Sequence, residues 1–177
     1  EHEGKVTGLA GRGNPNKLLK YMEKMIFYKN GKIYAVNGDY YVPFYEDGNN
    51  KKAWSKKAIN VFKKYSKADI AAATQKHLEN ILIKIVAYYM KKTNEKNLCV
   101  SGGVFANVLL NQKIRELKEV KNIFTLPHVG DEGLAIGAAT GYNWLVNKKK
   151  TKFKDLYLGP KFKINKKYLE KKYNIQI

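Results

Sequence analysis

The chain has 177 residues, with 34 Lys and Arg against 15 Asp and Glu, which gives a formal net charge of +19. Hydrophobic residues make up 44% of the chain and charged residues 28%, and this composition excludes disordered and fibrous proteins. No uncharged apolar stretch reaches the ~18 residues of a membrane span, and the single cysteine, Cys99, excludes a disulfide framework and a cysteine-based zinc site within the chain. From the length we expect one domain with at most an appendage. Because no signal peptide is visible, we expect a cytoplasmic location and no membrane partner.

The positive charge is concentrated in two blocks. Residues 51–96 and 148–177 each carry +9, whereas residues 97–147 are neutral. Such blocks suit the phosphate contacts of a nucleic-acid-binding protein. However, only Arg12 and Arg115 are arginines, and arginine is preferred for bidentate phosphate recognition. We therefore favour a solvated lysine-rich surface and keep RNA binding as an alternative.

Local patterns predict a loop, a helix and a hairpin at the start of the chain. The glycine-rich residues 6–13 indicate a loop or a tight helix-to-loop junction. Apolar residues at helical spacing after Asn14 predict a helix that ends at Asn30-Gly31. Asn37-Gly38 lies between two β-rich runs, and this dipeptide is typical of a hairpin turn because both of its residues tolerate positive φ.

Two helices are predicted next. A short basic helix covers about residues 54–65. Ser66, with Asp69 three residues later, is a variant of the capping box and opens a long helix that runs to about Lys92. The apolar spacing predicts the buried face of this long helix: Ile70, Ala73, His77, Leu78, Ile81, Leu82, Ile85, Val86 and Tyr89.

The neutral segment predicts an α/β unit. Its pattern is a strand over residues 97–101, a helix over 104–118, a strand over 122–126 and a helix over 134–147. Alternating strands and helices favour parallel strands, and ligands of such units bind beyond the carboxyl ends of the strands. A lysine-rich linker and a short helix near residues 165–172 follow.

The loop after the first of these strands is Ser101-Gly102-Gly103-Val104. Paired glycines let a backbone approach a ligand closely, and a helix that starts at once would direct its free N–H groups at a phosphate. Asn107, one turn further on, is placed to contact a sugar or a base. The alternative is an ordinary strand-to-helix turn.

The loop after the second strand carries Asp131 between Gly130 and a glycine-rich helix start. A carboxylate there suits a divalent metal that holds phosphate oxygens. The alternative is an Asp that caps its own helix. The stripe formed by Gly133, Gly137 and Gly141 is interpreted as close packing of that helix on a sheet.

Of three further residues, His77 and Cys99 favour structural roles, whereas His128 is of more functional interest. We expect His77 to be a semi-buried histidine with satisfied hydrogen bonds and Cys99 to be a small core residue. His128 lies beside the acidic loop, but no second histidine stands at a metal-ligand spacing. A complete metal site would therefore need ligands from residues that this sequence does not contain.

Four segments stand out when they are taken together and in order: Glu3–Ala10, Ala68–Glu79, Leu98–Asn107 and Pro127–Ala139. Together they resemble the carbamoyltransferases of the nodulation-factor and antibiotic-tailoring type. A further segment, Leu156-Tyr157-Leu158-Gly159-Pro160, is similar to the stretch that leads into that family's second domain.

The resemblance implies a fold and a chemistry. The fold is an α/β domain, part of an actin/Hsp70-like ATPase of the ribonuclease H-like kind, with a parallel-containing sheet, packed helices and a β-hairpin. Residues 1–147 would form the second half of that domain, and residues 148–177 a basic linker and short helix leading toward a YrdC-like domain. Family members use ATP and carbamoyl phosphate: the YrdC-like domain forms carbamoyl-adenylate, and the actin-like domain passes the carbamoyl group to a hydroxyl-bearing small molecule.

The same resemblance assigns site residues. Gly102, Gly103 and Val104 would line the nucleotide phosphates, and Asn107 would lie near the adenosine. Asp131 would bind a divalent metal, and the resemblance does not distinguish Fe, Mn and Mg. On the opposite wall, Glu3 and Lys5 would border the nucleotide.

Three departures from the family's pattern stand out. The family's His-x-x-x-His pair and the YrdC-like domain are not in this sequence, so the chain corresponds to a middle piece that by itself we expect to be inactive. Ala10-Gly11-Arg12-Gly13 replaces the usual Ala-Ala-Tyr-Gly. The alternatives to a part of an O-carbamoyltransferase are a basic RNA-binding module related to the threonylcarbamoyl-tRNA enzymes and a non-catalytic actin-like scaffold.

Overall fold

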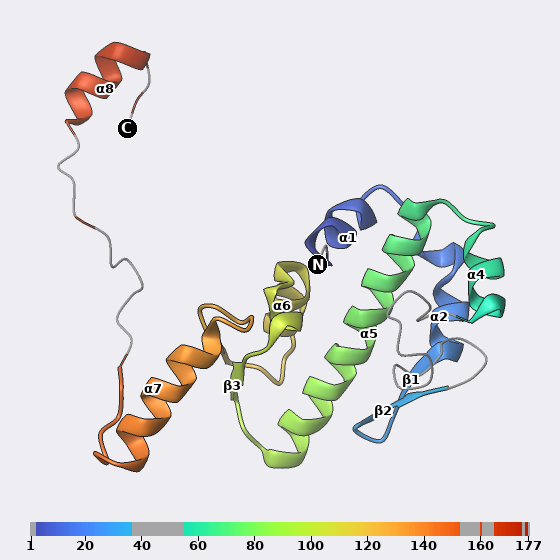
Figure 1. Ribbon diagram of the computed structural model, residues 1–177, viewed down its shortest axis with the longest axis horizontal. Helices are drawn as coiled ribbons and strands as arrows, with labels where there is room; N and C mark the ends of the chain where they lie inside the picture. The colour runs from blue at the N-terminus through green and yellow to red at the C-terminus, as the bar shows by residue number, and fades with distance from the viewer. Residues whose placement is uncertain (1–2, 37–54, 153–159, 161–164, 175, 177) are drawn as a thin grey trace. The chain divides into compact units, whose positions relative to one another are not determined.

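A computed structural model describes residues 3–36, 55–152, 160, 165–174 and 176 (Figure 1). The chain divides into two compact units, Glu1–Leu134 and Ala135–Ile177. The described part is α/β and contains an antiparallel strand pair and a parallel strand pair. None of its helices has the length and apolar character that crossing a membrane requires.

The first unit begins with helices. Helix α1 spans Glu3–Ala10, a 3-10 helix, η1, spans Pro15–Lys17, and α2 spans Leu19–Met25. Residues 6–13 were predicted as a loop or a tight helix-to-loop junction, and the junction is what the structure shows: α1 continues to Ala10, and a turn follows at residues 11–13. Helix α1 packs along the long helix α5 (Lys67–Thr93). Tertiary contact here overrides the low helix propensity of glycine.

A hairpin follows directly, and its turn differs from the prediction. Strands β1 (Ile26–Lys29) and β2 (Lys32–Ala35) pair antiparallel. Asn30 and Gly31 between them have φ of 49° and 81°, as the turn of a two-residue hairpin requires. The predicted helix end at Asn30-Gly31 was therefore wrong. The hairpin turn predicted at Asn37-Gly38 lies outside the described residues.

The two helices predicted next are confirmed. Helix α4 spans Lys56–Phe62, and α5 ends where Asn94 adopts the left-handed conformation with φ of 57°. The side chains of Ser55 and Ser66 cap these helices by accepting hydrogen bonds at 3.1 Å from the third residue on. Serine at this position satisfies a backbone N–H that the helix leaves free.

Helix α5 is the central element of the first unit, and other elements pack against more than one of its sides. Its buried residues are therefore not confined to a single apolar face. It contacts α1, η1, α2 and β1, and also α6 (Val108–Arg115). One core cluster joins it to α2 through Leu18, Met22, Met25 and Ala73. Its buried residues therefore include polar ones that the apolar spacing did not predict: Asp69, Gln75 and Glu79. Tyr89, predicted to be buried, is 44% exposed.

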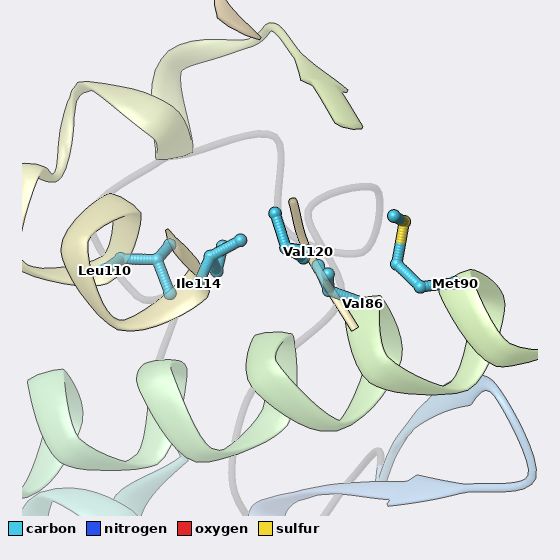
Figure 2. Packing of buried hydrophobic residues seen from close by; sticks show 5 residues of the cluster. All are labelled: Val86, Met90, Leu110, Ile114 and Val120. Carbon is cyan, nitrogen blue, oxygen red and sulfur yellow. The ribbon is translucent and has the colours of Figure 1, made fainter. Parts of the chain in front are cut away.

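The predicted parallel unit is confirmed. Strands β3 (Asn97–Val100) and β4 (Asn122–Thr125) pair parallel, with α6 between them in sequence. A second core cluster holds α5 and α6 together, as Figure 2 shows. Its members are Val86, Met90, Leu110, Ile114 and Val120. Cys99 is exposed rather than a core residue, because the side chains of a strand alternate between its two faces and Cys99 lies between the more buried Leu98 and Val100.

Helix α7 spans Gly133–Leu145 and α8 spans Lys166–Tyr173, so both predicted helices are confirmed. The glycine stripe of α7 is close-packed at its first member only. A Cβ at Gly133 would collide with the backbone oxygen of His128, whereas one at Gly137 or Gly141 would meet nothing within 4 Å in the described structure.

Candidate functional site

One pocket brings together two of the segments that carry predicted site residues, α1 and the loop after β3, with part of α5, for which no site residue was predicted. It has a volume of about 360 Å³ and lies in the first unit. Its walls come from α1, from α5 and from the loop after β3. The lining residues are Gly4, Val6, Thr7, Thr74, Gln75, Leu78, Gly103, Val104, Ala106 and Asn107. This mainly apolar wall with a few polar groups has the size and character of a small-molecule site.

The loop after β3 supplies one wall of the pocket. Gly102 has φ of 101° and ψ of 151°, a combination that is essentially restricted to glycine. A 3-10 helix, η3 (Gly103–Ala106), follows, and α6 begins only at Val108. The continuous helix predicted from Val104 is therefore interrupted, because Asn107 adopts an extended conformation and caps α6 with its side chain.

Gly103 is the residue of this loop that fits the predicted close approach to a ligand. It lines the pocket, and a Cβ at its position would meet no atom within 4 Å. The absence of a side chain thus leaves open space rather than relieving a clash. Val104 lines the pocket beside it and is 49% exposed, whereas Gly102 is not among the lining residues.

Asn107 is held by a chain of side-chain hydrogen bonds that the sequence reasoning missed. Its amide and that of Gln75 bond reciprocally: Asn107 Nδ2 donates to Gln75 Oε1 at 2.8 Å, and Gln75 Nε2 donates to Asn107 Oδ1 at 3.2 Å. Gln75 Nε2 also donates to Glu79 Oε1 at 2.8 Å, and Lys113 Nζ is paired with Glu79 Oε2. The four-residue spacing of Gln75 and Glu79 predicts that both lie on one side of the helix. It does not predict that Asn107 and Lys113 are their partners.

The opposite wall is only partly the predicted one. Gly4 and Val6 of α1 line the pocket, so this helix does border the site. Lys5 between them is exposed and does not line it, because neighbouring residues of a helix point in different directions. Glu3 begins α1, and its side chain is outside the part that the structure describes.

Asp131 is not among the residues that line the pocket; it lies in the loop between β4 and α7. It is exposed, and within the described ranges its carboxylate forms no hydrogen bond or ion pair. Only its backbone oxygen is engaged, by the N–H of Leu134 at 3.0 Å. The capping alternative, which requires the carboxylate to bond its own helix, is therefore not what the structure shows.

The described residues do not complete a metal site. Among them, no group of three His, Cys, Asp or Glu side chains is placed to hold a metal ion. A single carboxylate binds a divalent ion weakly. Asp131 therefore fits a metal only as one ligand among others that come from outside the described part of the chain.

His77 has a structural contact, as predicted, but only on one side of its ring. It is 8% exposed, and its Nε2 lies 2.7 Å from the backbone oxygen of Ile26. Because a carbonyl only accepts, Nε2 is the donor. Nδ1 has no hydrogen-bond partner in the described structure, so the prediction of a fully satisfied histidine was wrong in that respect. His77 lines a second, apolar pocket of about 430 Å³ that contains none of the predicted site residues.

Asp69 anchors the segment that follows α1. Its carboxylate accepts hydrogen bonds from Lys17 Nζ at 2.7 Å and from the backbone N–H of Asn14 at 2.8 Å. These contacts lower the pKa of Asp69 from 3.8 to about 2, because each stabilises the charged form. Since α1 and α5 both line the first pocket, this anchor helps to set the distance between two of its walls.

Comparison with known proteins identifies the relatives of this chain. A family model described as "Carbamoyltransferase N-terminus" matches residues 1–140. An uncharacterized protein of Methanocaldococcus jannaschii, MJ1058, is 30% identical over 138 residues, which cover 77% of this chain and 22% of that protein.

Two further relatives have informative names. The nodulation protein NolO of Bradyrhizobium diazoefficiens is 32% identical over 94 residues, covering 52% of this chain and 17% of that protein. The tRNA N6-adenosine threonylcarbamoyltransferase of Ureaplasma urealyticum is 40% identical over 82 residues, covering 46% of this chain and 25% of that protein. The chain thus spans a quarter or less of the length of these three relatives.

Proposed function

Because this chain belongs to the carbamoyltransferase family, we propose that it forms one part of an ATP- and carbamoyl-phosphate-dependent O-carbamoyltransferase. In this proposal it supplies a wall of the nucleotide site, within a domain of the actin-like ATPase fold. The acceptor is a hydroxyl-bearing small molecule. The observation that supports the proposal most directly is the first pocket, since residues from three of the four segments that resemble the family line it together.

The pocket suits the adenosine part of a nucleotide. Its apolar wall, which includes Val6, Leu78 and Val104, offers burial to a purine ring, and burial of apolar surface is the main contribution of such a site to affinity. The open space at Gly103 allows a phosphate to approach the backbone. We assign Gly102, Gly103, Val104 and Asn107 to this nucleotide.

The transfer step that we propose conserves its atoms. The carbamoyl group arrives as carbamoyl-adenylate. An oxygen of the acceptor hydroxyl attacks the carbonyl carbon, the bond from that carbon to the phosphate oxygen breaks, AMP leaves with the electron pair, and the hydroxyl proton passes to a base. Binding the adenosine part in the pocket would hold the carbonyl carbon in place for this attack.

We assign Asp131 to a divalent metal whose other ligands lie outside the described residues. A bound metal would stabilise the charge that develops on phosphate oxygens. The exposed carboxylate, which has no partner in the described part of the chain, is available for this role. We also propose that Glu3 and Lys5 border the nucleotide.

A titration of the intact protein with ATP tests the proposal. We expect saturable binding that Gly103→Ala weakens, and ATP-dependent transfer of label from carbamoyl phosphate to a hydroxyl acceptor. A protein that folds normally but binds no ATP would contradict the nucleotide site.

RNA binding is the second candidate. The net charge of +19 and the similarity to a tRNA N6-adenosine threonylcarbamoyltransferase favour it. Its test is the salt dependence of tRNA affinity.

A further inference from the structure

Two polar side chains of α5 are buried beside the first pocket, Gln75 at 8% and Glu79 at 3% exposure. Gln75 lines the pocket, whereas Glu79 does not. A buried carboxylate and a buried amide are costly unless their hydrogen bonds are made. Here the two side chains bond to each other, to Asn107, which caps α6, and to Lys113 of α6.

The donors and acceptors of this chain of hydrogen bonds have only one consistent assignment. At one end, Glu79 is a carboxylate paired with Lys113, and a carboxylate only accepts. Gln75 must therefore turn its NH₂ group toward Glu79. At the other end, the backbone N–H of Leu110 donates to Asn107 Oδ1 at 3.1 Å, so this atom is the oxygen of the amide.

The two ends together prevent the amide pair from flipping. A concerted flip of Gln75 and Asn107 would preserve the bonds between them, since each amide would simply exchange its oxygen and nitrogen. It would, however, set the Gln75 oxygen against Glu79 and the Asn107 NH₂ group against the N–H of Leu110. Both encounters are repulsive, so Glu79 locks one side and Leu110 the other.

The locked orientation leaves one hydrogen available. Gln75 uses both N–H groups, toward Glu79 and Asn107. Asn107 Oδ1 accepts from two donors, and one of the two N–H groups of Nδ2 bonds Gln75. The second N–H of Asn107 has no partner in the described structure, and Asn107 lines the pocket.

We propose that Glu79 is a positioning residue of the pocket: acting through Gln75, it holds Asn107 so that an N–H, and not an oxygen, is presented to the ligand. This inference rests on the proposed nucleotide site and adds that the bound nucleoside places a hydrogen-bond acceptor, a ring nitrogen or a ribose oxygen, at Asn107. Glu79 itself does not touch the ligand.

The test compares Glu79→Gln with a matched control in the intact protein. Glu116 accepts from Gln112 Nε2 at 3.0 Å across the same four-residue spacing, but on the exposed surface of α6, so Glu116→Gln removes the same charge away from the pocket. A glutamine at position 79 can present either its oxygen or its NH₂ group to Gln75, so it no longer fixes the orientation of the Gln75 amide. We expect ATP affinity to fall about fivefold in Glu79→Gln, the effect of one hydrogen bond, and to stay unchanged in Glu116→Gln.

A double-mutant cycle separates positioning from general loosening. Asn107→Ser keeps a capping oxygen for α6 and removes the amide. If Glu79 acts through Asn107, Glu79→Gln has no further effect on ATP affinity in the Asn107→Ser background. An equal loss in both backgrounds would overturn the proposal, and so would wild-type affinity in Glu79→Gln.

A measurement on the unaltered protein keeps the test independent of any variant's stability. In NMR spectra, ATP should shift the free side-chain N–H of Asn107 more than the side-chain N–H signals of Gln75. If ATP binds and the Asn107 signal does not move, the positioning proposal fails and the nucleotide site stands. If the wild-type protein binds no ATP at all, the nucleotide site and this inference fail together.

Discussion

The carboxylate of Asp69, in the first turn of α5, accepts a hydrogen bond from the backbone N–H of Asn14 at a distance of 2.8 Å. The two residues are 55 positions apart in the sequence, so this bond ties the segment after α1 to the start of the central helix. Lys17 adds an ion pair from the same segment. The packing here is close, since a Cβ at Gly13 would collide with the backbone of Ala68.

We predict that Asp69→Asn lowers stability in a pH-dependent way. The hydrogen bond from Lys17 and that from Asn14 hold the pKa of Asp69 at about 2, below its ordinary 3.8. A lowered pKa stabilises the fold above the unfolded-state pKa, and this stabilisation is lost as pH falls toward 2. In urea unfolding, the wild type should exceed Asp69→Asn at pH 6, and the difference should shrink between pH 4 and pH 2. Glu23→Gln, an exposed site on α2, is the control, and a difference independent of pH would contradict the prediction.

We predict that Gly103→Ala separates ligand binding from stability. Gly103 does not have positive φ, and an added Cβ meets nothing within 4 Å, so the free energy of unfolding should change by less than about 1 kcal/mol. ATP affinity should fall far more, because the methyl group occupies the approach to the backbone. Gly102→Ala is the contrasting variant: its φ of 101° should cost about 1–3 kcal/mol of stability. Unchanged ATP affinity in a normally melting Gly103→Ala protein would leave this loop as an ordinary strand-to-helix turn.

We predict that Asp131→Asn abolishes carbamoyl transfer in the intact protein and leaves its melting temperature unchanged. The carboxylate is exposed and has no contact to lose in the described structure, while asparagine removes the charge that a divalent ion requires. Transfer activity, bound metal and thermal melting should be measured on the same preparation. Near-normal activity and metal content would show that Asp131 is not a metal ligand.

We predict that the 177-residue chain by itself transfers no carbamoyl group from carbamoyl phosphate and ATP. Its described residues contain no group of three metal-binding side chains, and a lone carboxylate does not hold a catalytic metal. Incubation with labelled carbamoyl phosphate, ATP and a divalent metal is the assay, and label appearing in an acceptor would refute the prediction.

We predict that tRNA binding by this chain is weak and disappears near physiological salt. The charge comes mainly from lysines, and Arg12 and Arg115 are the only arginines in the sequence. Phosphate contacts of lysines at a solvated surface weaken steeply with salt. A filter-binding titration from low to physiological salt measures this. Retention of tight binding would favour the RNA-binding function instead.

Local signals were sufficient wherever one short stretch decides its own conformation. Ser66 predicted the start of α5, and alternating strands and helices predicted the parallel pair of β3 and β4. The same kind of signal misled at Asn30-Gly31, because positive φ at both residues serves a hairpin turn as well as a helix end, and the helical spacing of the preceding residues favoured the wrong choice.

Relationships between distant residues came only from the tertiary structure. The sequence determined that Gly103 and Asn107 belong to one loop, but not that Gln75 and Glu79 from α5 lock the Asn107 amide. It also could not show that α1 and this loop line one pocket, or that Asp131 is not among the lining residues. Periodicity reports which face of a helix is apolar, whereas the partner of a buried polar side chain depends on which element packs against that face, and this is decided when α5, α6 and α1 come together.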